Sequence, residues 1–174
     1  IAKLFVLFMN RGVDGWGPGD FIKLDTGVGV PVAPAPLAGY PNGLGTTTSV
    51  DVDLNGTVDL VYAGDRLGNL YRFNIEDSNP ANWSVTRLFT ASYTDGGGVT
   101  TVQPILSKPT VSKHPTEPGF LVTFGTGSHV ALDDAQNEDI QSIYTIWDMG
   151  ALHPATAQPD TKALRLVEQT MTNV

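Results

Sequence analysis

The sequence predicts an all-β fold built from short antiparallel strands. Short runs of β-branched and aromatic residues alternate with polar ones, which is the period of a half-buried strand. Turn-forming residues separate these runs throughout the chain, which contains 19 glycines and 12 prolines. No segment has the apolar spacing of an amphipathic helix longer than two turns. This combination is typical of β-sandwiches, barrels and propellers.

The expected strands are, in chain order, 3–9, 20–25, 44–50, 58–63, 69–75, 83–90, 109–113, 120–124 and 142–148. The clearest hairpin joins 58–63 to 69–75, and its second arm places Tyr71, Phe73 and Ile75 on one face. A second hairpin is expected around residues 114–119. Groups of strands recur about every 40 residues, close to the length of one propeller blade.

Three segments between or after these strands are predicted from composition. The proline-rich stretch 28–40 is expected to be an extended connection. The stretch 93–101, with three consecutive glycines, is expected to be a mobile loop. The tail 163–171 is ambiguous between strand and helix, with a weak preference for strand.

Composition excludes several classes of protein. The 174 residues are 41% hydrophobic, enough for a packed core, and the net charge of −8 argues against a nucleic-acid partner. With no cysteine there is neither a disulfide framework nor a thiolate metal site. The longest early apolar run, 4–9, is too short to cross a bilayer. Because that run reads as a buried strand at the very start, the chain is expected to be a fragment, 1–174, of one larger domain.

The most informative stretch is DVDLNGTVD at 51–59. Oxygen-bearing side chains stand at loop positions 1, 3, 5 and 9 and a glycine at position 6, as in the first part of an EF-hand calcium loop. Gly56 permits the sharp turn that lets the position-7 carbonyl face the ion. The sequence therefore predicts Ca²⁺ bound by Asp51, Asp53, Asn55, Thr57 through its carbonyl, and Asp59.

This loop departs from a complete EF-hand in one respect. Position 12 is Tyr62 instead of a bidentate glutamate, and it lies within the expected strand 58–63. The prediction is an EF-hand-like calcium loop that enters a strand, with binding weakened to roughly the micromolar to millimolar range. The alternative is an Asx-rich turn that binds no metal.

Beyond the loop, a set of motifs in fixed order resembles one known family. The run YAGDRLGNLYRF at 62–73 is followed by QPI, KPTV, HP, GFLVTFGTG and QSIYTIWD at 103–105, 108–111, 114–115, 119–127 and 141–148. This order resembles the C-terminal domain of the PilY family, called PilC in some bacteria, and the resemblance is strongest over 46–148. It implies part of a modified β-propeller made of several antiparallel blades.

The resemblance also implies a function. Proteins of that family act at the tip of type IV pili, where calcium regulates the balance between extension and retraction, with effects on adhesion and twitching motility. It implies minor pilins and the pilus tip as partners, contact with host cells or abiotic surfaces, and no catalytic activity. The implied location is extracellular or on the cell surface, at the pilus tip, in association with the outer membrane of a Gram-negative bacterium.

Two other functions remain open from the residues. An integrin-like or lectin-like propeller would use calcium loops to staple its blades, but such proteins repeat the loop and this chain has one. A quinoprotein-type enzyme is the weakest possibility, because no convergent acid–base set is visible.

The remaining polar groups are expected to be structural. His114, His129 and His153 lack metal-ligand spacing, and 125–129 is expected to be a tight turn. Asp65 is expected to cap the turn between the arms of the first hairpin. The acidic residues Asp133, Asp134, Glu138 and Asp139 are expected to form a solvated loop in preference to a second cation site.

Overall fold

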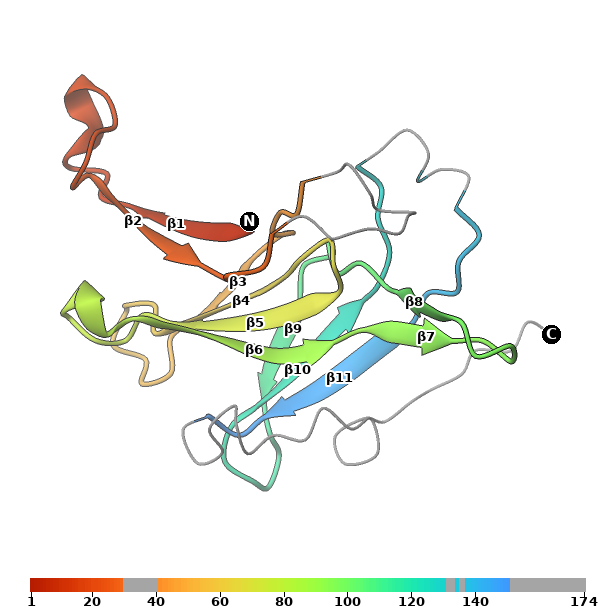
Figure 1. Cartoon of the computed structure of the whole chain (residues 1–174). Coiled ribbons are helices and arrows are strands. Elements are labelled where there is room, and N and C mark those ends of the chain that lie inside the picture. Colours follow the sequence, from red (N-terminus) through yellow and green to blue (C-terminus); the bar gives the residue numbers. More distant parts are fainter. Residues whose placement is uncertain (30–40, 131–133, 135–136, 151–174) are drawn as a thin grey trace.

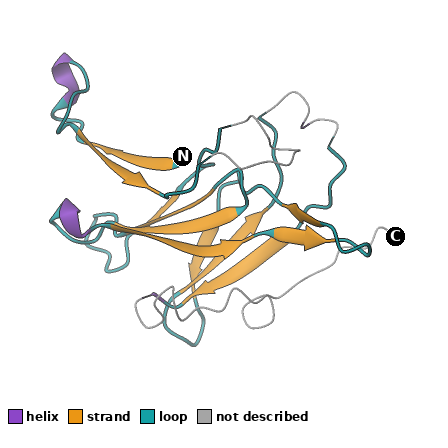
Figure 2. Cartoon of the chain, in the orientation of Figure 1, coloured by secondary structure: helices purple, strands orange, loops and turns teal. Residues whose placement is uncertain are grey.

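A computed structural model describes residues 1–29, 41–130, 134 and 137–150 of the chain. Its described part is built from antiparallel strands and two single-turn 3₁₀ helices, Gly12–Asp14 and Pro80–Asn82 (Figures 1 and 2). The strands are β1 (Lys3–Leu7), β2 (Phe21–Asp25), β3 (Thr48–Val50), β4 (Leu60–Gly64), β5 (Asn69–Asn74), β6 (Ser84–Thr90), β7 (Ser92–Thr94), β8 (Thr100–Val102), β9 (Thr110–Lys113), β10 (Phe120–Gly125) and β11 (Ile143–Asp148).

The strands form sheets in which each strand pairs with its neighbour in sequence. The largest is a four-stranded meander in the order β3-β4-β5-β6, and the next is the three-stranded β11-β10-β9. Two further hairpins are β1–β2 and β7–β8. Short connections and consecutive pairing make the four-stranded sheet resemble one blade of a propeller.

Strand β4 lies at the centre of the core and uses both of its faces. Leu60 and Tyr62 join a cluster that includes Val122, Tyr144 and Ile146 from the sheet β9–β11. The alternate residues of β4, Val61 and Ala63, join a second cluster that Leu4 and Leu24 of the β1–β2 hairpin help to cover. Successive strand residues point to opposite faces, so β4 is covered by a different element on each side.

The end of β4 approaches a neighbouring segment so closely that only glycine fits. A Cβ atom at Gly64 would overlap the side chain and carbonyl oxygen of Ile105. Ile105 is fully buried, and its N–H donates to the carbonyl oxygen of Asp65 at 2.9 Å. The absence of a side chain at Gly64 therefore lets the segment around Ile105 pack against the four-stranded sheet.

The predicted all-β class and both predicted hairpins are confirmed. β4 pairs with β5 and β9 pairs with β10, each antiparallel. The expected strand 44–50 is shorter in the structure, because only Thr48–Val50 pairs as a strand while Leu44 forms an isolated bridge with Asp65. No helix in the described part of the chain has the length and hydropathy needed to cross a bilayer.

The segment 93–101, expected to be a mobile loop, contains paired strands. The segment forms the β7–β8 hairpin, with Thr94 paired with Thr100. The glycines lie in the turn of this hairpin. Asp95 Oδ1 closes the turn by accepting the N–H groups of Gly97 and Val99 at 2.9 and 2.8 Å. Most of the predicted connection 28–40 and all of the tail 163–171 lie outside the described residues.

Candidate calcium site

The loop 51–59 is held at both of its ends by the four-stranded sheet. Asp51 directly follows β3, and Asp59 directly precedes β4. The N–H of Asp59 donates to the carbonyl oxygen of Val50 at 2.9 Å, and the N–H of Ile75 donates to the carbonyl oxygen of Asp59 at 2.8 Å. Asp59 thereby extends the pairing of β4 with both of its neighbours, so its side chain is placed by the sheet.

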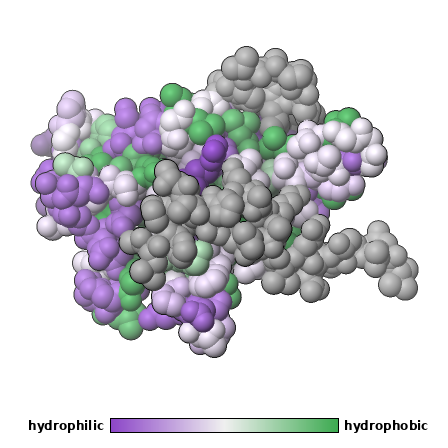
Figure 3. Space-filling model, turned by 60° about the horizontal axis from the view of Figure 1, so that its bottom comes forward, coloured by the Kyte–Doolittle hydropathy of each residue, from purple (hydrophilic) through white to green (hydrophobic). Residues whose placement is uncertain are grey.

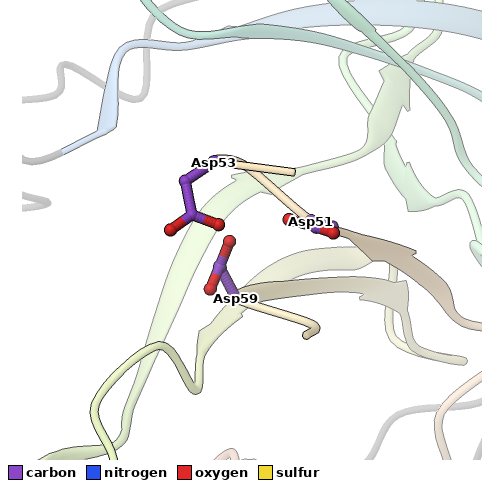
Figure 4. Close-up of side chains that lie close together, drawn as sticks. All are labelled: Asp51, Asp53 and Asp59. Atoms are coloured by element: carbon purple, nitrogen blue, oxygen red, sulfur yellow. The ribbon is translucent and has the colours of Figure 1, made fainter. Parts of the chain in front are cut away.

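Three carboxylates of the loop come together as the sequence predicted. Asp51, Asp53 and Asp59 each offer an oxygen atom that lies within 4.8 Å of the other two. The side chains of Asp53 and Asp59 point toward one another, with Asp51 beside them (Figure 4). Asp59 is only 4% exposed and its Oδ2 accepts the N–H of Val52 at 2.6 Å, whereas Asp53 is exposed.

The backbone of the loop turns as a calcium loop of this pattern requires. Gly56 has φ of 90°, in the region that glycine adopts without strain. Its N–H donates to Asp51 Oδ2 at 2.8 Å, which fixes the first aspartate against the turn. Leu54 also has a positive φ, 62°, and its side chain is 78% exposed.

The two other predicted ligands are less clearly placed. Asn55 Oδ1 accepts the N–H of Thr57 at 2.8 Å and also the Thr57 hydroxyl, while Asn55 Nδ2 donates to Asp53 Oδ2 at 2.9 Å. The amide of Asn55 therefore belongs to the hydrogen-bond network of the loop. A ligand role for Asn55 and for the carbonyl of Thr57 stays a prediction.

The donor set fits a hard divalent cation. All three clustered groups are carboxylates, the oxygen ligands that Ca²⁺ prefers. None of the ion pairs among the described residues involves Asp51, Asp53 or Asp59. Three negative charges this close repel one another, and a bound cation relieves that repulsion.

Hydrophilic residues dominate the left part of the face in Figure 3, the side on which Figure 1 shows the turn between β5 and β6.

Comparison with known proteins gives the family. The model of the PilY1 β-propeller domain matches residues 24–173. The chain belongs to the PilY1 β-propeller family.

Named relatives agree with this assignment. The chain is 34% identical over 122 residues to a type IV pilus biogenesis factor PilY1 homolog of Xylella fastidiosa, covering 65% of this chain and 8% of the relative. It is 31% identical over 157 residues to the type IV pilus biogenesis factor PilY1 of Pseudomonas aeruginosa strain UCBPP-PA14, covering 77% of this chain and 14% of the relative. The chain thus spans a small part of these relatives.

A solved structure shows the same fold. The crystal structure of the Pseudomonas aeruginosa PilY1 C-terminal domain matches with a TM-score of 0.56 and 30% sequence identity, over 69% of this chain and 28% of that chain. The propeller part of the fold prediction is thereby confirmed. The four-stranded meander β3–β6 and the sheet β9–β11 belong to this PilY1 β-propeller fold.

In this PilY1-family chain Asp65 caps the hairpin turn as expected, and it does more. Its Oδ1 accepts the N–H groups of Leu67 and Asn69 at 2.9 and 2.8 Å. Its Oδ2 accepts from Tyr71 Oη at 3.0 Å and from Asn42 Nδ2 at 2.8 Å, and the side-chain amide of Asn69 contacts both oxygens. Asp65 is fully buried and is the centre of a polar network between the turn and Asn42.

The other polar candidates have structural surroundings. His114 stacks on Trp147 with ring centroids 4.6 Å apart, and its Nδ1 accepts the N–H groups of Thr116 and Glu117. Asp134 Oδ2 accepts from Ser128 Oγ at 2.6 Å and from the N–H of Val130 at 2.7 Å, which closes the turn after β10. Within the described residues only Asp51, Asp53 and Asp59 form a group of three possible metal-binding side chains. Asp133 and His153 lie outside the described residues.

Sequence reasoning missed one buried polar group of the PilY1-family chain. Asp148, at the end of β11, accepts hydrogen bonds from Tyr62 and Arg72 of the four-stranded sheet. These three residues, here called the inter-sheet cluster, include partners 86 and 76 positions apart in the sequence. No local spacing marks such a contact.

Proposed function

We propose that this chain is the calcium-binding part of a type IV pilus-associated protein. The observation that carries the proposal is the convergence of Asp51, Asp53 and Asp59 within 4.8 Å in a loop anchored to the sheet. Calcium would be held by these carboxylates, with Asn55 and the Thr57 carbonyl as further oxygen ligands. Bound there, the ion would supply positive charge that cancels the repulsion among the three aspartates.

Membership of the family supports a role in the pilus. The relatives are named type IV pilus biogenesis factors, a name that refers to assembly and not to a reaction. We infer a non-enzymatic role at the pilus tip on the bacterial surface, with minor pilins as partners. We infer in addition that calcium regulates pilus extension and retraction there, and so supports adhesion and twitching motility.

The chain's own residues suggest how the cation would act. Asp59 is buried and fixed by backbone hydrogen bonds to Val50 of β3 and to Ile75, directly after β5, whereas Asp53 is exposed and reaches the cluster from the outer part of the loop. Without a cation, repulsion favours movement of Asp53 away from the fixed Asp59. With a cation, both ends of the loop are held together and the start of β4 is ordered. A partner that binds this ordered state more tightly than the cation-free state would therefore respond to the cation.

The alternative, a propeller whose calcium loops staple its blades, predicts a similar cluster in most blades. The described residues contain one such cluster, next to β4. The sheet β9–β11 has a hairpin turn at 114–119 where His114 and backbone groups form the contacts. This difference between the two sheets favours a regulatory site over repeated stapling.

Thermal unfolding with and without calcium tests the proposal. A ligand that binds only the native state raises the unfolding midpoint. At a ligand concentration one hundred times Kd, the free energy of unfolding increases by about 2.7 kcal/mol. The chain should show this rise, and Asp53→Asn, an exposed substitution, should reduce it strongly. Asp95→Asn, which alters an exposed aspartate of the β7–β8 turn, is the matched control. A rise that Asp53→Asn leaves intact would place calcium elsewhere.

A further inference from the structure

We infer that Asp148 is a positioning residue for the calcium loop, acting through Tyr62 and Arg72 on strand β4 and its neighbour β5. The inter-sheet cluster would then couple the loop 51–59 to the sheet β9–β11. The inference rests on the proposed function, because it concerns how the calcium site communicates with the adjoining sheet.

Asp148 connects two sheets through charge-assisted hydrogen bonds. Its Oδ2 accepts from Tyr62 Oη at 2.7 Å, and its Oδ1 accepts from Arg72 Nη1 at 2.6 Å and from the N–H of Gly150 at 3.0 Å. Asp148 is 1% exposed and the Arg72 side chain 12% exposed, so water competes little for either group. Burial, and next the charge of Asp148, raise the pKa of Tyr62, which keeps its hydroxyl a proton donor.

Tyr62 and Arg72 are placed by the same pairing that anchors the calcium loop. They are directly opposite each other in the register of β4 with β5. Asp59 stands three residues before Tyr62, and its backbone is hydrogen-bonded to Val50 of β3 and to Ile75, directly after β5. The metal ligand and the inter-sheet cluster therefore share one short piece of strand, 59–62, that is paired on both sides.

The apolar core reinforces this connection. Leu60 and Tyr62 pack in one cluster with Tyr144 and Ile146 of β11. Displacement of the first residues of β4 would disturb this packing and the hydrogen bonds to Asp148 together. Suppose that cation binding strengthens the packing of β4 against β11 by a given factor. By linkage, loss of this packing must then lower the affinity for the cation by that factor.

The test uses the full chain and calcium alone as the probe. With Trp16→Phe and Trp83→Phe, Trp147 is the single tryptophan, and it lies next to Asp148 and stacks on His114. Calcium affinity is measured by calorimetry, and Trp147 fluorescence is followed in the same titration at pH 8. Tyr62→Phe removes one hydroxyl from the inter-sheet cluster. Tyr144→Phe is the matched control: it removes another buried hydroxyl of the same core, one that donates to Gln103 and not to Asp148.

We expect calcium to change Trp147 fluorescence in the parent chain. Tyr62→Phe should raise Kd at least about fivefold, the lower end of typical couplings, and abolish the fluorescence change, whereas Tyr144→Phe should behave as the parent. A merely structural role would lower the unfolding midpoint of Tyr62→Phe and leave its Kd unchanged, and that result would overturn the inference. Equal weakening by both variants would overturn it too. Absence of calcium binding to the parent would instead reject the proposed function, and the inference with it.

Discussion

The hydroxyl of Tyr62 donates a hydrogen bond of 2.7 Å to Asp148 Oδ2, although 86 positions separate the two residues in the sequence. The hydrogen bond joins the centre of the four-stranded sheet to the last residue of β11. Arg72, opposite Tyr62 in the sheet, contributes the only positive charge among the donors that bond to Asp148 in the described structure. The buried carboxylate of Asp148 thus has its charge balanced by a residue from another sheet. This one carboxylate helps to fix how the two sheets pack against each other.

Replacing Asp148 by Asn should destabilise the chain substantially. Breaking a buried pair by removing one partner costs about 3–5 kcal/mol, because the remaining Arg72 charge stays buried. The matched control is Asp25→Asn, which breaks the surface pair with Lys3 at 2.7 Å and should cost far less, because solvent screens exposed charges. Urea unfolding measures both, and equal losses would contradict the role assigned to the inter-sheet cluster.

Asp65→Asn should be among the most damaging single substitutions in the chain. Asp65 is fully buried and accepts from Leu67, Asn69, Tyr71 and Asn42, so an amide would direct N–H groups at existing donors. Leaving buried donors unsatisfied costs about 1–3 kcal/mol for each group. Asp95→Asn changes a similar but exposed turn, so a free energy of unfolding within about 1 kcal/mol of the parent is expected. A tolerant response at Asp65 would show that the network is dispensable.

Stability should fall in alkaline solution. Burial, followed by the neighbouring carboxylates Asp148 and Asp65, raises the pKa of Tyr62 and Tyr71 above the ordinary value of 10.0. Above about pH 10 the unfolded chain loses these protons while the folded chain retains them, so the unfolded state binds fewer protons and the free energy of unfolding decreases. Below pH 10 this contribution is fully present.

Urea unfolding between pH 8 and 11 checks this expectation. The slope should reach about 1.4 kcal/mol per pH unit for each tyrosine. The Tyr62→Phe variant, which is expected to be less stable at neutral pH because it lacks the hydrogen bond to Asp148, should show a shallower decline than the parent. Parallel curves for parent and variant would mean that another group controls the alkaline transition.

Gly64→Ala should separate the four-stranded sheet from the segment around Ile105. The new methyl group would overlap the carbonyl oxygen and side chain of Ile105, and backbone atoms cannot yield as a flexible side chain can. Overpacking of this kind costs about 1–3 kcal/mol. Gly96→Ala is the control, because a Cβ there meets nothing within 4 Å. Similar thermal midpoints for the two variants would refute the close approach.

Local sequence patterns were sufficient for the strands of the first hairpin and for the clustering of the aspartates. The β-branched and aromatic residues in 58–63 and 69–75 predicted the strands, and the observed strands Leu60–Gly64 and Asn69–Asn74 differ only at their ends. The spacing of Asp51, Asp53 and Asp59 was informative because a loop that turns at Gly56 brings these positions to one side.

Other features depended on contacts that no local pattern encodes. The glycines at 96–98 predicted a mobile loop and gave no sign of the pairing of β7 with β8, whose turn is closed by the carboxylate of Asp95. Trp83 donates to the carbonyl oxygen of Asp77 and Trp147 to that of Pro118, each near a turn of its own sheet, and no local spacing predicts either contact.

The central claim is that Asp51, Asp53 and Asp59 bind calcium, and calcium-specific anomalous scattering from a crystal of the chain tests it most directly. We predict one anomalous peak between these three carboxylates, with oxygen ligands at about 2.3–2.6 Å. A crystal grown at a calcium concentration that raises the unfolding midpoint, yet without a peak in the 51–59 loop, would contradict the claim.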